Sequence, residues 1–399
     1  MVQQKLVSSE KTNKDDGIRQ EEPELRFPNF FDSWKVSKLG EISTVSGGKR
    51  MPKGSTLIDE QNNHPYITVS NMNTDLTDLN NFQFVPLDIF PQIKNYIVNE
   101  NDLIISVAGT LGLVKKVPKI LDKANLTENA NRISKIQINE DYLYFYLNSN
   151  LIQNRILSVQ TNNAQPKLAL KEIRNFKIKY PSNNEQKKIA NLFLNIDKKI
   201  ALLEKEYQTY QDFKKYLMQQ IFTQKLRFEN LNGELKKYKL KEIFDVKSSN
   251  ISINSIEDNI GEFPLYGTSG YIKSIDFYEM KQDYISISKD GTVGKIDYHE
   301  SKSSVINTSQ YLIPKEDFNL HFLYYHMQML NFKKYIVGST IPHIYFKDYG
   351  NEKILMPDLN EQEQIGGLLV NVDKIVDSMK KNIFLMNKYK KGLLQKMFV

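Results

Sequence analysis

Three kinds of loop in this 399-residue chain carry side chains suited to contacting a nucleic acid. The run Ser46–Lys53 (SGGKRMPK) places three cations on a glycine-rich loop, where they can meet phosphates or guanine edges. Two Gly-Thr-x-Gly turns, Gly109–Gly112 and Gly291–Gly294, expose backbone amides that can bind a phosphate. Gln165-Pro166-Lys167 and Ile341-Pro342-His343 stand at matching positions further on, and Gln and Lys are base-reading side chains.

Each of these loops taken alone is more often a solvated turn, but their recurrence in both halves of the chain makes binding an equally good explanation. The formal net charge of +7 permits a polyanionic partner without proving one. The residues predicted to contact DNA are Lys49, Arg50, Lys53, Thr110, Lys115, Gln165, Lys167, Lys247, Tyr266, Thr268, Lys289, Thr292, Lys295, Thr340 and His343.

Catalytic signatures are missing. The chain has no cysteine, no Gly-x-Gly-x-x-Gly loop and no adjacent prolines, which excludes thiol chemistry and the Asn/Asp-Pro-Pro-aromatic motif of amino-methyltransferases. Gly291–Lys295 has the wrong spacing for a phosphate loop. His321 and His326 are five residues apart, which does not place them on one helical face for a metal. We therefore predict no catalytic residue and no metal ligand.

The chain repeats itself. Residues 25–42 resemble residues 226–243, the Gly-Thr-x-Gly turns recur 182 positions apart, and residues 181–223 align without a gap to 357–399. The offset between the two copies falls along the chain from 201 to 182 to 176, so the second copy has deletions, most of them between residues 66 and 101 of the first. Two explanations remain open: an old duplication whose middle has drifted, or two modules that read different targets from one shared framework.

Two long helices are predicted at the ends of the repeats. Apolar residues three or four apart run from Ile189 to Ile221 and from Ile365 to Met397, with Asn184 and Asn360 as candidate N-caps. Each helix would have about 35–40 residues. The stripes are predicted to include Phe213, Ile375 and Tyr389. Because neither helix can bury such a stripe alone, we expect an antiparallel coiled coil with pseudo-two-fold symmetry.

The segments between the helices favour a mixed fold. Tyr66–Val69, Leu103–Val107 and Tyr284–Ser288 read as strands, and Tyr142–Leu147 and Phe322–Met327 as helix starts. The expected fold class is α+β, with two tandem α/β-type domains that are each followed by a long helix.

The pattern resembles one family, the specificity subunits of type I restriction-modification systems. The resemblance is carried by Asn184–Ile189 with Asn195-Ile196-Asp197, by Asn360–Ile365 with Asn371-Val372-Asp373, and by the closing runs Lys214–Phe222 and Lys390–Phe398, together with Trp34–Ile42 and the Gly-Thr-x-Gly turns. It covers the chain from about residue 25. One departure is Leu235, which stands where the first copy has Trp34.

The resemblance implies a domain organisation. It consists of a polar tail (1–24), target-recognition domain 1 (25–180), spacer helix 1 (181–225), target-recognition domain 2 (226–356) and spacer helix 2 (357–399).

The resemblance also implies a non-catalytic, cytoplasmic DNA-recognition subunit. Each domain would read one half of a split double-stranded target, and the helices would fix the gap and dock two modification subunits, with restriction subunits completing the complex. S-adenosylmethionine, ATP and Mg²⁺ would bind the partner subunits, not this chain. Expected docking residues are Glu185, Gln186, Ile189, Asp197, Glu361, Gln362, Ile365 and Asp373.

Two alternatives remain at this point. The chain could be an interaction scaffold whose modules bind something other than DNA, or a nuclease or methyltransferase with an unrecognised site. Salt-sensitive, sequence-dependent DNA binding would argue against the scaffold, and activity of the purified chain alone would indicate an enzyme.

Overall fold

A computed structural model describes residues 7–8, 22–160, 167–228, 233–315, 318–340 and 342–399. The chain divides into two compact units. Unit 1 comprises Met1–Leu202 and Ile383–Val399, and unit 2 comprises Leu203–Asn382. Each long helix therefore contributes one part to each unit.

Unit 1 is built on a four-stranded antiparallel sheet. Its strand order is β4 (Thr44–Gly47), β10 (Ala130–Ser134), β7 (Leu103–Ser106) and β8 (Val114–Lys116). Its smaller sheets are β6 (Gln83–Phe84)–β5 (Pro65–Ile67)–β9 (Asn125–Leu126), β3 (Lys35–Lys38)–β11 (Lys177–Tyr180) and β1 (Val7–Ser8)–β2 (Leu25–Arg26). Its short helices are α1 (Leu39–Ile42), α2 (Phe90–Ile93), α3 (Glu140–Leu147), α4 (Asn150–Gln160) and α5 (Leu170–Arg174).

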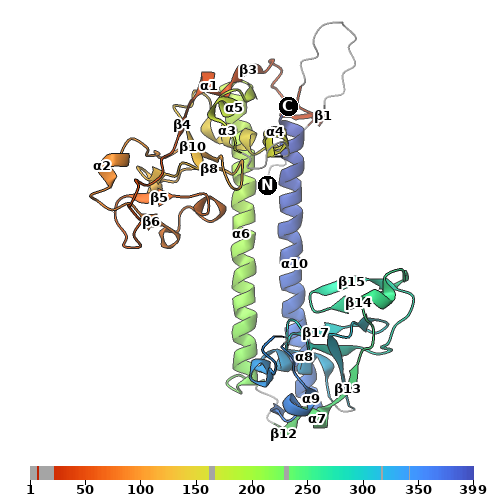
Figure 1. The fold of residues 1–399 in the computed structure, drawn as a ribbon. Coiled ribbons are helices and arrows are strands. Elements are labelled where there is room, and N and C mark those ends of the chain that lie inside the picture. Colours follow the sequence, from red (N-terminus) through yellow and green to blue (C-terminus); the bar gives the residue numbers. More distant parts are fainter. Residues whose placement is uncertain (1–6, 9–21, 161–166, 229–232, 316–317, 341) are drawn as a thin grey trace. The chain divides into compact units, whose positions relative to one another are not determined.

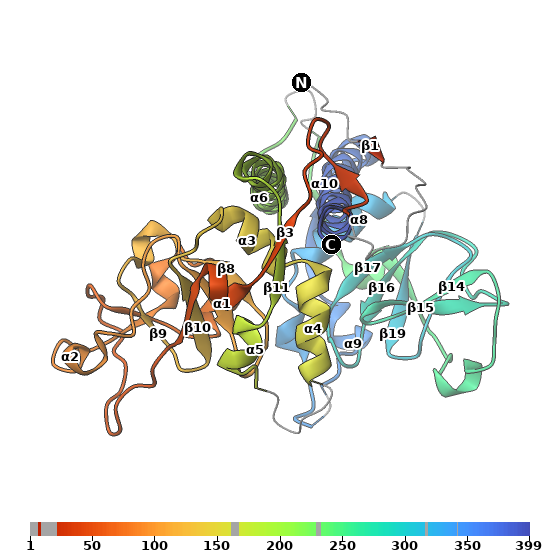
Figure 2. The ribbon, with the colours of Figure 1, turned by 90° about the horizontal axis from the view of Figure 1, so that it is seen from above.

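Among the described residues, unit 2 repeats all the sheets of unit 1 except β1–β2. Its four-stranded sheet has the order β13 (Phe244–Ser248), β19 (Ser309–Pro314), β16 (Tyr284–Ser288) and β17 (Ile296–His299), and the last three can be followed in Figure 2. The smaller sheets are β15 (Gly270–Ile275)–β14 (Phe263–Gly267)–β18 (Ser304–Val305) and β12 (Lys236–Lys239)–β20 (Lys353–Met356). Helices α7 (Leu240–Ile243), α8 (Leu320–Gln328) and α9 (Phe346–Tyr349) complete it.

The three-stranded sheets show how closely the two units agree. In both, the middle strand pairs antiparallel with one neighbour and parallel with the other: β5 with β9, and β14 with β18. The units differ where the sequence offsets predict. Between β5 and β7, residues 68–102 form β6, α2 and two 3₁₀ turns, whereas residues 268–283 of unit 2 form little more than β15.

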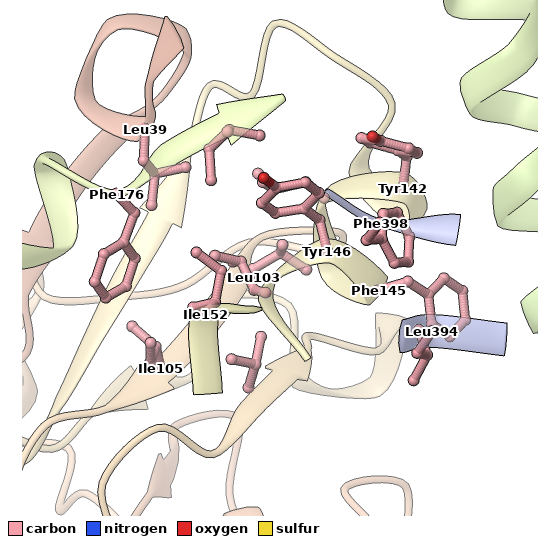
Figure 3. Close-up of a cluster of buried hydrophobic side chains, with 14 of the residues drawn as sticks. Leu39, Leu103, Ile105, Tyr142, Phe145, Tyr146, Ile152, Phe176, Leu394 and Phe398 are labelled. Carbon is pink, nitrogen blue, oxygen red and sulfur yellow. The ribbon is translucent and has the colours of Figure 1, made fainter. Parts of the chain in front are cut away.

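The core of unit 1 joins the sheet, α3 and the end of the second long helix. Figure 3 shows Tyr142, Phe145 and Tyr146 of α3 packed beside Leu394 and Phe398. The ring centroids of Tyr142 and Phe398 are 5.4 Å apart, an edge-on contact. In unit 2, Phe322 makes the same contact with Phe222 at 5.5 Å. Each domain core is therefore completed by the last turn of a long helix.

The long helices are α6 (Asn183–Phe222, 40 residues) and α10 (Leu359–Met397, 39 residues). The predicted lengths are correct, but both predicted N-caps are two residues late. The helices begin directly after Ser182 and Asp358, and the Asp358 carboxylate accepts from the backbone N–H of Glu361 at 2.9 Å. Asn184 and Asn360 lie inside the helices.

The buried stripe of each helix alternates strictly between steps of four and three residues. None of its positions is exposed: Ile189, Phe193, Ile196, Ile200, Leu203, Tyr207, Tyr210, Lys214, Leu217 and Ile221 in α6, and Ile365, Leu369, Val372, Val376, Met379, Ile383, Met386, Lys390, Leu393 and Met397 in α10. Phe213, Ile375 and Tyr389, which the sequence favoured, are exposed. The prediction was wrong there because it followed hydrophobicity. The heptad spacing instead places a lysine or Val376 in the buried stripe, which we call the seam because the two helices pack along it.

Each lysine of the seam meets an aspartate of the other helix. In unit 1, Lys390 Nζ lies 2.5 Å from Asp197 Oδ1, and in unit 2, Lys214 Nζ lies 2.5 Å from Asp373 Oδ1. Phe193 stacks on Phe398 four residues before Asp197. The residue numbers rise from Phe193 to Asp197 along α6 while those of their partners fall from Phe398 to Lys390, so the pairing within unit 1 is antiparallel. Figure 1 shows the start of α6 beside the end of α10 in that unit.

No described helix is both long and apolar enough to cross a membrane.

Reversing one charge of a seam pair should destabilise unit 2. Lys214→Glu would oppose Asp373 with a like charge, and we expect a loss of about 1–2 kcal/mol in unfolding free energy. Adding Asp373→Lys should restore most of it. Urea denaturation of both variants measures this, with Lys215→Glu at an exposed neighbour as the control. Equal losses for Lys214→Glu and Lys215→Glu would contradict a role for the pair.

Unit 2 should lose stability in mild acid. Burial lowers the pKa of His326, which stacks on Phe222, to about 4. The unfolded chain binds this proton near pH 6.5 while the native state stays neutral. The stabilisation is therefore complete above about pH 6.5 and falls by on the order of 3 kcal/mol as pH drops to about 4. Unfolding titrations of His326→Phe should show a shallower acid loss; an unchanged slope would contradict this assignment.

Candidate nucleic-acid interface

The glycine-rich loop of unit 1 is clamped against the turn that precedes β10. Gly48 N–H donates to the Ala130 carbonyl at 3.0 Å, and Lys49 N–H donates to the Leu126 carbonyl at 2.8 Å. A Cβ on Gly48 would lie 2.0 Å from the carbonyl oxygen of Thr127. Glycine is therefore required here, and the clamp holds the following cations at the surface.

The three cations of this loop have different surroundings. Arg50 Nε lies 2.6 Å from Glu128 Oε1, although its side chain remains 79% exposed, and this hydrogen bond raises the pKa of the guanidinium. Lys49 Nζ lies 5.6 Å from the ring centroid of Tyr96. Lys53 is exposed. A phosphate could reach Lys49 and Lys53 directly, whereas Arg50 would have to break its bond to Glu128 before it could bind the phosphate.

The Gly-Thr-x-Gly turns have the same conformation in both units. Both glycines of each turn adopt positive φ, between 74° and 80°. Gly112 N–H donates to the Ser106 carbonyl at 3.0 Å, and Gly294 N–H to the Ser288 carbonyl at 2.8 Å. Each turn therefore closes on the end of the central strand, and its threonine, Thr110 or Thr292, is exposed at the tip.

The segment that precedes α5 or α9 lies against the same turn. Leu168 N–H donates to the Val107 carbonyl at 3.0 Å, and Ile344 N–H donates to the Lys289 carbonyl at 3.2 Å. Lys167 is exposed, and His343 is half-buried. Gln165 lies outside the described residues. The two loops that recur in the sequence are therefore neighbours within each unit.

Unit 2 gathers five of its predicted contacts at this turn. Lys295 Nζ donates to the Thr268 carbonyl at 2.9 Å and lies 2.9 Å from Asp297 Oδ2, so its charge is already engaged. The five residues are Thr268, Lys289, Thr292, Lys295 and His343, and exposed Thr340 lies on the loop that Val337 and His343 close.

The remaining predicted residues lie elsewhere. Tyr266 packs on His299 at 4.5 Å between ring centroids and is half-buried. Lys247 lies on β13, two strands from β16, with its ammonium 5.5 Å from the Tyr311 ring. Lys115 is half-buried on β8, opposite Ile104.

The expected docking residues at the helix starts are mostly buried. Glu185 is 1% exposed and accepts two hydrogen bonds from the Arg26 guanidinium, at 2.8 and 2.9 Å. Glu361, also 1% exposed, is held in the same way by Arg227. The bond to the carboxylate raises the pKa of each arginine. We call these two pairs the arginine clamps.

The glutamine that follows each clamp is equally engaged. The side-chain oxygen of Gln186 accepts from Asn139 N–H at 2.9 Å, and its amide donates to the Pro181 carbonyl at 2.8 Å. Gln362 makes the same two bonds, to Asn319 and Pro357, at 2.9 Å each.

These contacts revise the docking prediction. Ile189 and Ile365 belong to the seam, and Asp197 and Asp373 are paired with lysines. All eight side chains therefore fix a helix to its own unit, and six of them have almost no exposed surface to offer a partner. The signal that sequence reasoning missed was the clamp arginine, which recurs unchanged as Arg26 and Arg227.

In the described part of the chain, no three His, Asp or Glu side chains cluster in the way that would hold a metal ion.

The fold and its repeated loops define a class of protein, the DNA specificity domains of type I restriction-modification systems. The model of that family matches residues 32–209 and 232–384. The chain belongs to this family. The resemblance in the sequence, the two-domain α+β fold class and a DNA-specificity role are thereby confirmed.

Individual relatives agree. A Methanocaldococcus jannaschii protein, the type I restriction enzyme MjaVIII specificity subunit, is 25% identical over 93% of this chain and 92% of its own length. A putative type I specificity subunit of Mycoplasma genitalium is 22% identical, covering 94% and 96%. The crystal structure of the S subunit from M. genitalium has a TM-score of 0.61 with 20% identity over 95% of this chain and 99% of that one. This last likeness shows the fold.

Proposed function

We propose that this chain recognises a split DNA sequence for a type I restriction-modification complex, with the sheet-bearing part of each unit reading one half-site. The observation that carries the proposal is the repeated loop framework. The same backbone hydrogen bonds place the Gly-Thr-x-Gly turn beside the segment before α5 or α9, while the side chains on them differ. A shared framework with different surface chemistry suits two readers of different sequences.

The chain would supply recognition rather than chemistry. Lysines and arginines near the turns would bind phosphates in a salt-dependent way, and loop side chains would read bases, each good bidentate pair contributing about 1–3 kcal/mol of discrimination. Two modification subunits would supply S-adenosylmethionine and methylate adenine N6 after flipping the base. Restriction subunits would use ATP and Mg²⁺ to cleave unmethylated DNA.

Docking would use the exposed faces of the long helices, since the buried ones are occupied. Phe213 of α6 and Tyr389 of α10 are equivalent in the repeat and are 48% and 52% exposed. Exposed aromatic side chains at matching positions would give two modification subunits one similar surface each. A plain scaffold with non-DNA modules is not favoured, because the family model that matches both halves describes DNA specificity domains.

The proposal is tested by expressing the chain with its modification subunits and mapping N6-methyladenine across a host genome. We expect one motif with two specified halves around a constant gap. Exchanging residues 244–356 for another module should change only one half. An assembled complex that adds no methylation would overturn DNA recognition, and a change in both halves would contradict independent reading.

The helices should act as a ruler for the gap. A heptad inserted between Leu202 and Leu203 of α6, matched by one between Asn382 and Ile383 of α10, preserves the contacts within each unit. Seven residues add about 10 Å of helix, roughly three base pairs of DNA. Methylation mapping should therefore show a gap about three base pairs longer. An unchanged gap would contradict the ruler.

A further inference from the structure

The turn of unit 2 carries one pair of side chains that its counterpart in unit 1 does not have. His343 Nδ1 is hydrogen-bonded to the carboxylate of Asp290, the residue that precedes Gly291. By the alignment of the repeats, unit 1 has Ala108 and Lys167 at these two positions. The backbone bonds that close the turn and join it to the following segment are nevertheless the same in both units, from Gly112 and Leu168 in unit 1 and from Gly294 and Ile344 in unit 2. The framework therefore forms without the His–Asp pair, and folding alone does not explain it.

His343 is held on rigid supports. It exchanges two backbone hydrogen bonds with Val337, both at 2.9 Å, and the next residue, Ile344, is 1% exposed in the core. Asp290 is fixed as well, because its N–H donates to the Thr308 carbonyl at 3.2 Å. The imidazole is nonetheless 37% exposed. A side chain that is fixed in direction and open at one edge meets the geometric requirement for reading a base.

The carboxylate also decides which nitrogen is free. A carboxylate accepts a hydrogen bond, so in the neutral imidazole the Nδ1–H of His343 donates to Asp290 and Nε2 carries the outward lone pair. Within the residues that the structure describes, Nε2 has no hydrogen-bond partner. An acceptor in the major groove is complementary to the exocyclic amino groups, N6 of adenine and N4 of cytosine.

We infer that His343 is a specificity-determining residue of unit 2, reading the exocyclic amino group of one adenine or cytosine through Nε2, with Asp290 as its positioning residue. This inference rests on the proposed DNA-recognition function. Lys167 of unit 1 carries only donors at the equivalent place, which suits guanine or a phosphate instead. The two units then differ in base chemistry at one shared structural position.

The test uses the full chain assembled with its modification subunits and duplexes that carry the mapped motif. At each position, adenine is replaced by purine and cytosine by 2-pyrimidinone, which removes only the amino group. We expect one position of one half-site at which wild-type affinity falls about 3- to 10-fold. That loss should vanish in His343→Lys and in Asp290→Ala, which install the residues that unit 1 already accommodates.

Asp290→Asn is the matched control that separates the hydrogen bonding of Asp290 from the size of its side chain. It keeps the size of the side chain, and its amide N–H can donate to Nδ1, an arrangement in which Nε2 becomes a donor, whereas the carboxylate can only accept. We expect it to lose the amino-group dependence at the same base, and thermal unfolding should match the wild type. Lys167→Ala should leave that base unaffected.

The outcomes separate two failures. If His343→Lys and Asp290→Asn keep every amino-group dependence of the wild type, the inference is overturned while DNA recognition stands. If the wild-type complex shows no base preference at any position, the proposed function itself fails. Should Asp290→Ala unfold, Asp290→Asn and His343→Lys still decide the question.

Discussion

The burial of a carboxylate at the first turn of each long helix constrains the rest of the structure. Glu185 and Glu361 are withdrawn from water, and an unpaired buried charge costs several kcal/mol, so each needs its arginine. Arg26 and Arg227 come from the strand or segment that leads into the domain. Each clamp therefore ties the entrance of a domain to the helix that leaves it, and the neighbouring glutamine ties in α3 or α8 as well.

The seam continues this constraint along the helices. Leucine or isoleucine at all positions would tolerate a slip by one heptad, because one apolar residue packs much like another. The two lysine–aspartate pairs do not tolerate such a slip, because a slipped helix would leave half-buried charges without partners. These pairs are Lys214–Asp373 and Lys390–Asp197. Tyr325 strengthens the pair in unit 2, where its hydroxyl donates to Asp373 at 2.7 Å. The polar positions thus select one register, at some expense in apolar burial.

Sequence alone was sufficient for the repeated parts and for element types. The central strand Tyr284–Ser288 and both long helices were located to within a few residues, because buried runs and heptads leave strong periodic signals. It was insufficient where hydrophobicity and geometry disagree: Phe213 and Tyr389 are exposed, while lysines one residue later occupy the seam. The sequence also led to the prediction that Glu185 and Gln186 dock a partner subunit. A polar helix start looks the same in sequence whether its partner is a buried arginine or a second protein.

The pairing of Asp290 with His343 shows why the reading residues were harder to find than the framework. The two residues are 53 positions apart, and nothing in either local sequence indicates that they touch. The framework recurs, so comparing the two halves reveals it and places His343 opposite Lys167. The comparison does not reveal that Asp290 is the partner of His343. The structure identifies these positions, because backbone hydrogen bonds beside them agree between the units while the side chains differ. Unit 1 has Ala108 and Lys167 where unit 2 has Asp290 and His343. At such positions base chemistry can vary without cost to the fold.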